Sequence, residues 1–241
     1  TTTRWMYTPP SNSGVGVLSA ASPTPSPIGV GSDADWDSAH DVAFYTAGGG
    51  SSSIMRWRHT TDTWLTGIRF SVAGVETGLG IGSTIAYSPQ ADRLFVINRN
   101  GVTGDGRLYY LDSPSTASGL TDFTSTGLQV TLSSATPAYN RMARVTTGGN
   151  DYIYVIGTTA GNAGKTQLVD SLAGTPKLRE APGFPFNWGY YEVYDGGALE
   201  WDGAGTLYAI QGGGHPDLSW RAVPADPVAD AVTDRGCLPL S

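Results

Sequence analysis

Three aspartates occur at alternate positions near the start of the chain, at Asp33, Asp35 and Asp37. Alternate side chains of a β-strand point to the same face, so these carboxylates would lie together and repel one another unless a cation or water satisfied them. Calcium prefers oxygen clusters of this kind, but the glycine that bends an EF-hand loop around its ion is absent. The spacing therefore supports a calcium site as one hypothesis and solvated strand residues as the other, and no other cofactor is expected.

A second candidate site is a run of six aromatic residues within eleven positions, just before the last predicted strand pair. Rings exposed on a loop could stack on sugar rings or contact a protein, because amphipathic aromatic residues concentrate in binding sites. Buried rings would instead fill the space between neighbouring sheets. The sequence leaves both interpretations open. The candidate binding residues are Phe184, Phe186, Trp188, Tyr190, Tyr191 and Tyr194.

Motifs for known catalytic chemistries are incomplete. The segment 161–166 ends in Gly-Lys-Thr, but a phosphate-binding loop would need a glycine where this chain has Thr159, followed by a helix. A Gly-x-Ser-x-Gly nucleophile motif is absent, and His40, His59 and His215 lie too far apart in sequence to form a metal-ligand motif. We expect structural or surface histidines, no catalytic residue and no enzymatic activity, although loops distant in sequence could still assemble a site.

Composition excludes several classes of partner. Charged residues make up 15% of the chain, against roughly 25% in an average soluble domain. The net charge of −7 opposes a general role in nucleic-acid binding, which requires basic residues to neutralise phosphates. No stretch approaches eighteen consecutive apolar residues, so membrane insertion is not expected. Cys237 is the single cysteine, so an intrachain disulfide is excluded.

A repeat unit recurs four times along the chain. Each copy has a short strand, a turn and an apolar strand that ends at glycine or a polar residue, and two further strands are expected in most copies. The equivalent turn positions lie 51, 59 and 54 residues apart, at Asp41, Asp92, Asp151 and Gly205. This spacing fits one four-stranded propeller blade. No window shows sustained helical periodicity, so an all-β fold is predicted.

The first repeat resembles a kelch repeat. In Val42–Gly49 an apolar strand ends in a double glycine, Met55–Trp57 places an aromatic on the next strand, and Thr61–Trp64 places a tryptophan after a short turn. The last repeat matches through its glycines at 212 and 213 and through Trp220, while the middle two keep only the strand pattern. The resemblance implies a small kelch-like β-propeller. A two-layer sandwich is the alternative, because short strands with glycine turns also describe that fold.

The predicted architecture is a single β-propeller domain over residues 1–241, with four kelch-like four-stranded blades. Five blades are the alternative, if the N- and C-terminal pieces occupy separate sheets. We predict that residues 3–18 pair with the sheet that begins near Ala198 and so close the ring, within an N-terminal segment of closing strands and linker at 1–27. The predicted blades are 28–70, 71–135, 136–182 and 183–241.

Low charge, abundant serine and threonine, and a disulfide-free all-β fold favour a binding function over catalysis. We expect a non-enzymatic binding or structural assembly module at an extracellular, filament or virion surface, which contacts a protein partner or itself through blade loops. The alternative is glycan binding, as a lectin-like propeller or an accessory domain of a carbohydrate-active enzyme. That alternative rests on the aromatic run at 184–194.

Overall fold

The computed structural model describes residues 4–8, 17–80, 82–99, 106–130, 140–157, 166–184, 197–212 and 215–230. These residues form nineteen strands and one short helix, α1 (Pro227–Asp230), which confirms the predicted all-β class. No helix in this part of the chain is long and apolar enough to span a membrane.

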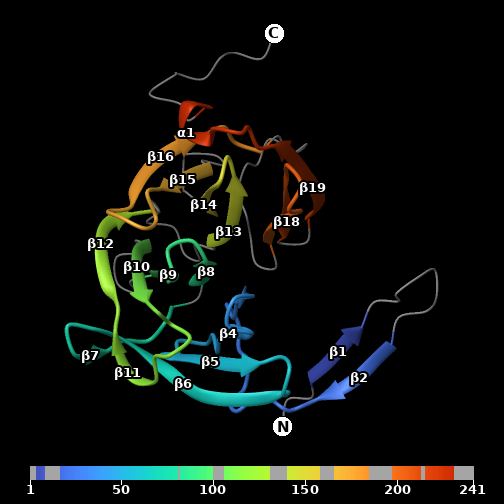
Figure 1. The fold of residues 1–241 in the computed structure, drawn as a ribbon, viewed down its shortest axis with the longest axis vertical. Helices are drawn as coiled ribbons and strands as arrows, with labels where there is room; N and C mark the ends of the chain where they lie inside the picture. The colour runs from blue at the N-terminus through green and yellow to red at the C-terminus, as the bar shows by residue number, and fades with distance from the viewer. Residues whose placement is uncertain are drawn as a thin grey trace.

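Four antiparallel units succeed one another along the chain (Figure 1). The first sheet contains β3 (Ala34–Asp37), β4 (Val42–Thr46), β5 (Ser53–Arg58) and β6 (Thr63–Val72), joined by β7 (Val75–Glu76) and by β11 (Gly119–Asp122), which pairs parallel to β6. The second sheet contains β8 (Thr84–Ser88), β9 (Arg93–Arg99), β10 (Gly106–Asp112) and β12 (Thr124–Gln129). The third contains β13 (Asn140–Thr147), β14 (Asn150–Gly157), β15 (Thr166–Asp170) and β16 (Lys177–Ala181). The fourth contains β17 (Ala198–Trp201), β18 (Thr206–Gly212) and β19 (His215–Ala222).

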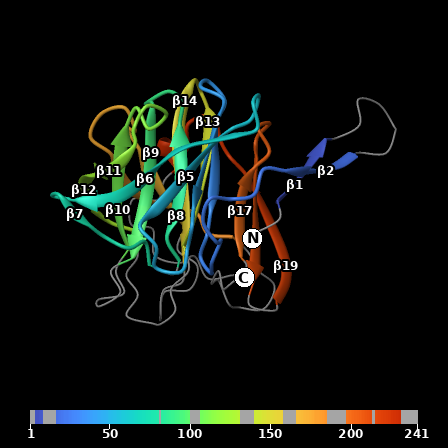
Figure 2. The same cartoon turned by 90° about the horizontal axis from the view of Figure 1, so that it is seen from below.

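The four sheets are arranged around a common centre, like the blades of a propeller (Figure 1). The first strand of each sheet is the innermost: β3 contacts β8, β8 contacts β13, and β13 contacts β17. Figure 2 shows these sheets from a second direction, with their strands side by side. In Figure 1 the fourth sheet and the first sheet are the two ends of an arc. The described residues thus form a propeller-like arc of four sheets.

Three apolar clusters hold neighbouring sheets together. Phe44 and Phe70 of the first sheet pack in one cluster with Tyr87 of the second, and further clusters join the second sheet to the third and the third to the fourth. Leu94 to Ile97 of β9 are buried without interruption, because this sheet is covered on both faces. Full burial of a large apolar side chain contributes about 1.5–3 kcal/mol, so these clusters are the main stabilising force between sheets.

The repeat predicted from the sequence is visible in one recurring hydrogen bond. In three sheets the residue at the turn between the first and second strands accepts a bond at its carbonyl from the amide of the residue after the third strand. These bonds join His59 to Asp41 (3.4 Å), Ser113 to Asp92 (2.8 Å) and Val223 to Gly205 (2.9 Å). All three turn residues have a positive φ, which Asp and Gly tolerate better than most residues.

The N-terminal strands are not part of the fourth sheet. Strands β1 (Arg4–Thr8) and β2 (Val17–Ala21) pair with each other as a separate two-stranded sheet, which lies outside the arc in Figure 1. Ser22 follows β2 directly and bonds to Asp62 at the β5–β6 turn, with its amide 3.1 Å and its hydroxyl 3.0 Å from Oδ2. The chain therefore leaves the hairpin at the first sheet. The expected pairing of residues 3–18 with the sheet near Ala198 is not confirmed.

Candidate functional site

A small pocket of about 130 Å³ lies where the four inner strands meet. Its charged lining comes from Asp33 and Asp35 beside and on β3, Arg144 on β13 and Glu200 on β17. The rest of the wall is largely apolar and includes Ile85, Met142, Leu199 and Trp201. The described lining residues include no histidine, serine, threonine or cysteine. This central pocket can bind protons or a small polar species, and the reactive groups in its described lining are the carboxylates of Asp33, Asp35 and Glu200.

Two of the aspartates that we assigned to a calcium site instead join the first sheet to the second. Asp33 accepts bonds at Oδ2 from the Thr84 hydroxyl and from the Ile85 amide at 3.0 Å. Asp35 accepts a bond at Oδ2 from the Tyr87 amide at 2.5 Å. These carboxylates thereby satisfy backbone donors on β8 that have no partner strand on that side.

Burial changes the acidity of the carboxyl groups around the central pocket. It raises the pKa of Asp35 to about 6, since the backbone bonds from Tyr87 and Trp36 and the charge of Arg144 only partly oppose it. Burial also raises the pKa of Asp33 and of Glu200, in the latter case with a contribution from the negative charge of Asp33. Groups that titrate above their ordinary range gather at functional sites, but structural networks perturb them as well.

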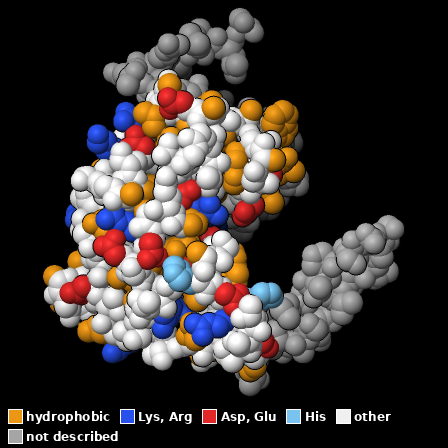
Figure 3. Space-filling model, viewed as in Figure 1, with side chains coloured by type: hydrophobic (Ala, Val, Ile, Leu, Met, Phe, Trp, Pro, Cys, Tyr) orange, Lys and Arg blue, Asp and Glu red, His pale blue; other side chains and the backbone are white. Residues whose placement is uncertain are grey.

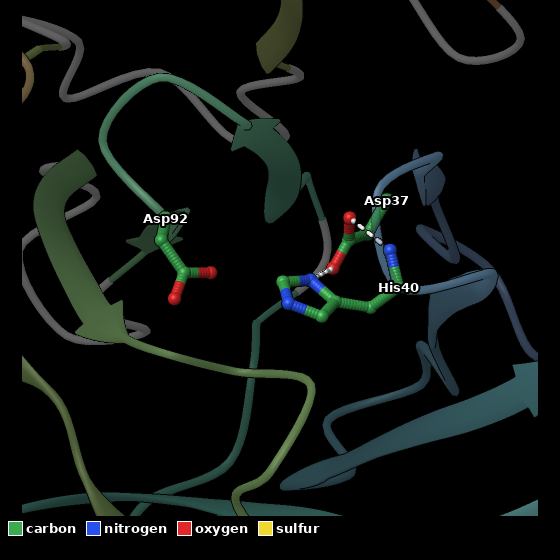
Figure 4. Close-up of side chains that lie close together, drawn as sticks. All are labelled: Asp37, His40 and Asp92. Carbon is green, nitrogen blue, oxygen red and sulfur yellow. Dashed lines mark hydrogen bonds and ion pairs between the residues drawn. The ribbon is translucent and has the colours of Figure 1, made fainter.

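Asp37 has a different environment from the other two aspartates. It is fully buried at the β3–β4 turn, where Oδ1 accepts bonds from the amides of Ala39 and His40 and Oδ2 lies 2.7 Å from Nδ1 of His40. Asp92 approaches from the β8–β9 turn (Figure 4). Potential ligand atoms of Asp37, His40 and Asp92 all lie within 4.8 Å of one another.

These three residues are the group of potential metal ligands that the described chain brings together, and Asp33 and Asp35 are not among them. Both carboxylates already have protein partners, because Asp92 accepts bonds from the Tyr87 hydroxyl at 3.0 Å and from the Ser113 hydroxyl at 2.9 Å. The hydrogen bonds of Asp37 and Asp92 therefore explain the arrangement as a network at the β3–β4 and β8–β9 turns, which joins the first sheet to the second. The calcium site at Asp33, Asp35 and Asp37 stays a prediction.

The aromatic run lies mostly outside the described residues. Phe184 is described and is 1% exposed, within the cluster between the third and fourth sheets. It is therefore a core residue, as the buried alternative for this run expected. The other five candidates, Phe186, Trp188, Tyr190, Tyr191 and Tyr194, fall in the part of the chain that the structure does not describe.

A larger pocket of about 310 Å³ lies at the turns of the second and third sheets, and we call it the turn pocket. Its lining residues come from the β8–β9 turn, the start of β14, the end of β15, the β15–β16 turn and α1. They are Gln90, Asn150, Asp151, Tyr152, Asp170, Ser171, Leu172, Ala173, Gly174 and Val228. The pocket thus combines amide, carboxylate and hydroxyl groups with an aromatic and two aliphatic side chains.

The fourth sheet leaves one apolar face uncovered. Leu207 and Ala209 of β18 are buried against the third sheet, whereas the alternate residues Tyr208 and Ile210 are 38% and 44% exposed. Across the strand pair, Tyr208 faces Trp220 and Ile210 faces Leu218, which are 63% and 60% exposed. Figure 3 shows hydrophobic side chains gathered over β18 and β19. We call the side chains of Tyr208, Ile210, Leu218 and Trp220 the apolar face.

Sequence reasoning missed both the turn pocket and the apolar face. Residues of the turn pocket are distant in sequence and carry no motif, so no signal marks them before the sheets are assembled. The apolar face did have a signal. The run Leu207-Tyr208-Ala209-Ile210 is apolar at every position, which in an end sheet implies that one apolar face stays uncovered.

No family model and no curated protein matches the chain. Among solved structures, a sialidase from Trypanosoma rangeli in complex with 2,3-difluorosialic acid is similar over 90% of this chain. The identity is 10% and the TM-score is 0.46, and this chain covers 37% of the length of that chain. A similarity this weak carries no argument about function, and the description of the fold rests on the strands and sheets themselves.

Proposed function

We propose that the chain is a non-enzymatic assembly module that associates with further copies of itself through the apolar face of the fourth sheet. The observation that carries this proposal is the exposure of four large apolar side chains, Tyr208, Ile210, Leu218 and Trp220, on adjacent strands of one sheet. Single exposed hydrophobic residues are ordinary, but a contiguous group of this kind marks a contact surface.

The other end of the arc offers a complementary surface. On the first sheet Tyr45 and Trp64 lie with ring centroids 5.6 Å apart, and Trp36 and Trp57 both pack against His59. Tyr45, Trp64 and Trp36 are partly exposed. A contact between the fourth sheet of one copy and the first sheet of the next would be heterologous, and contacts of this type repeat into rings or filaments.

We extend this proposal to a kelch-like propeller at an extracellular, filament or virion surface. The kelch-like signature of the first repeat and the low charge content support this, and neither depends on the apolar face. Glycan binding through the aromatic run is the second candidate. Of that run, Phe184 packs in the core, so this candidate rests on Trp188 and the rings that follow it in sequence.

Sedimentation velocity over a range of protein concentrations tests the assembly proposal. The double variant Leu218→Ser and Trp220→Ser removes apolar area from the apolar face, and we expect it to sediment as a monomer where the wild type forms larger species. The matched control is Val75→Ser with Leu120→Ser, which changes two residues that are also exposed, at 65% and 46%, but pair with the end of β6 that is far from Trp64. This control should associate like the wild type.

A wild type that stays monomeric at every concentration would overturn self-assembly, and so would equal loss of association in both double variants. A glycan array probed with wild type and Trp188→Ala tests the second candidate. Binding that disappears in Trp188→Ala would support glycan recognition by the aromatic run.

A further inference from the structure

We infer that the turn pocket is a binding site for one hydroxyl-rich unit, such as a single pyranose of a glycan. None of its described lining residues belongs to the aromatic run or to the apolar face, so the inference does not depend on the proposed assembly function. Its volume of about 310 Å³ lies at the lower end of the range for small-ligand pockets, about 300–1,000 Å³.

One carboxylate oxygen in the turn pocket lacks a partner. Asp170 is 4% exposed, and its Oδ2 accepts a bond from Nε of Arg179 at 2.5 Å. Its Oδ1 is buried and has no hydrogen-bond partner among the described residues. A buried oxygen without a partner is costly, because it loses its bond to water and gains nothing in return. A ligand or water that donates a hydrogen bond there would remove this cost.

The charge of Asp170 favours a neutral donor over a cation. Its carboxylate is already paired with the Arg179 guanidinium, so a hydroxyl group can use Oδ1 without adding a second positive charge. Asp151, the other buried carboxylate of the pocket, accepts bonds from Ser88, Gln90 and Thr146, and the Arg144 guanidinium lies 3.7 Å from its Oδ1 and offsets its charge. The pocket therefore offers a hydrogen-bond acceptor without a strong net charge.

The remaining wall has the mixed character that a sugar ring requires. Tyr152, Leu172 and Val228 give an apolar side, and the exposed amides of Gln90 and Asn150 lie at the rim. A pyranose presents C–H groups on its faces and hydroxyl groups at its edge, so it can contact an aromatic or aliphatic wall while it donates to Oδ1 of Asp170. The residues come from two sheets and from α1, which fixes their relative positions.

Titration calorimetry of the full chain tests this inference, with glucose, galactose, mannose and N-acetylglucosamine as separate probes and arginine as the cationic probe. We expect at least one sugar to bind. Asp170→Asn should lower the affinity for that sugar by about tenfold, because the charged acceptor is lost. Ala173→Trp should abolish binding by filling the pocket. The matched control is Ala204→Trp, on an exposed turn of the fourth sheet, which should bind like the wild type.

Thermal unfolding of each variant checks that the fold is kept. If Asp170→Asn has a clearly lower melting temperature than the wild type, the comparison of Ala173→Trp with its control Ala204→Trp decides the result. Loss of sugar binding in Ala173→Trp but not in Ala204→Trp would support the inference. It is overturned if no sugar binds, if arginine binds in place of the sugars, or if sugar binding is unchanged in Ala173→Trp.

Discussion

Replacing Asp35 by asparagine should raise the stability of the protein relative to the wild type as the pH rises from 4 to 8. In the folded protein burial raises the pKa of this carboxyl to about 6 from the ordinary value of 3.8. The folded state therefore binds a proton more tightly than the unfolded state. Stability contributed by this group is complete below about pH 4 and is lost as the pH rises through about 6.

The size of the effect follows from the pKa difference. A shift of about two units at about 1.4 kcal/mol per unit corresponds to a loss of about 3 kcal/mol between pH 4 and pH 8. Asparagine resembles the protonated carboxyl in shape, and its oxygen can still accept the bond from the Tyr87 amide. Its NH2 group cannot accept the bond that the Trp36 amide donates to the other oxygen, and this loss is the same at every pH. The stability of Asp35→Asn relative to the wild type should therefore rise by up to about 3 kcal/mol between pH 4 and pH 8.

Urea unfolding of both proteins at pH 4, 6 and 8 measures this difference directly. The control is Asp41→Asn, because bonds from Thr60 lower the pKa of the exposed Asp41 carboxyl, and this variant should gain no stability at pH 8. If Asp35→Asn changes stability by the same amount at every pH, burial does not control the ionisation of Asp35 and the reasoning is wrong.

Two further predictions concern contacts between elements. Gly48→Ala should destabilise the protein by at least about 2 kcal/mol more than Gly49→Ala, as measured by urea unfolding. A Cβ added at Gly48 would lie 2.7 Å from backbone atoms of Gly29, Val30 and Ser32, whereas a Cβ added at Gly49 would have no atom within 4 Å. Equal losses would show that the close approach is relieved easily. Asp151→Ala should cost about 3 kcal/mol, since it leaves donors of the second and third sheets without their buried acceptor. Asp202→Ala, which removes bonds only within one exposed turn, should cost less, and the opposite order would contradict the assigned role of Asp151.

The repeat was predictable because it depends on local pattern. Apolar strands, turn residues such as Asp41 and Asp92, and glycine breaks all follow from backbone preferences within about twenty residues, and the strands form there. The role of Asp33 and Asp35 was not predictable in the same way. Aspartates at alternate positions are expected both for a calcium site and for hydrogen bonds to β8. The bonds to β8 depend on a strand that lies about fifty residues further along the chain.

The pairing of the N-terminal strands was not predictable for a related reason. A short connection makes the pairing of β1 with β2 inexpensive in chain entropy, whereas pairing with the fourth sheet would bring together segments almost two hundred residues apart. The sequence pattern predicts the same strands for both pairings, and it carries no information on the chain entropy that each pairing costs. Residues of the turn pocket present the same difficulty, since Gln90 and Asp170 meet only after the second and third sheets have packed.

The apolar face of the fourth sheet gives the described arc of sheets a surface to which a further sheet could be added. The inner strands of the sheets contact one another in chain order, and the fourth sheet packs against the third through the cluster around Leu199, Leu207 and Val223. A blade duplicated or fused after residue 223 can cover the apolar face without rearranging the sheets that come before it.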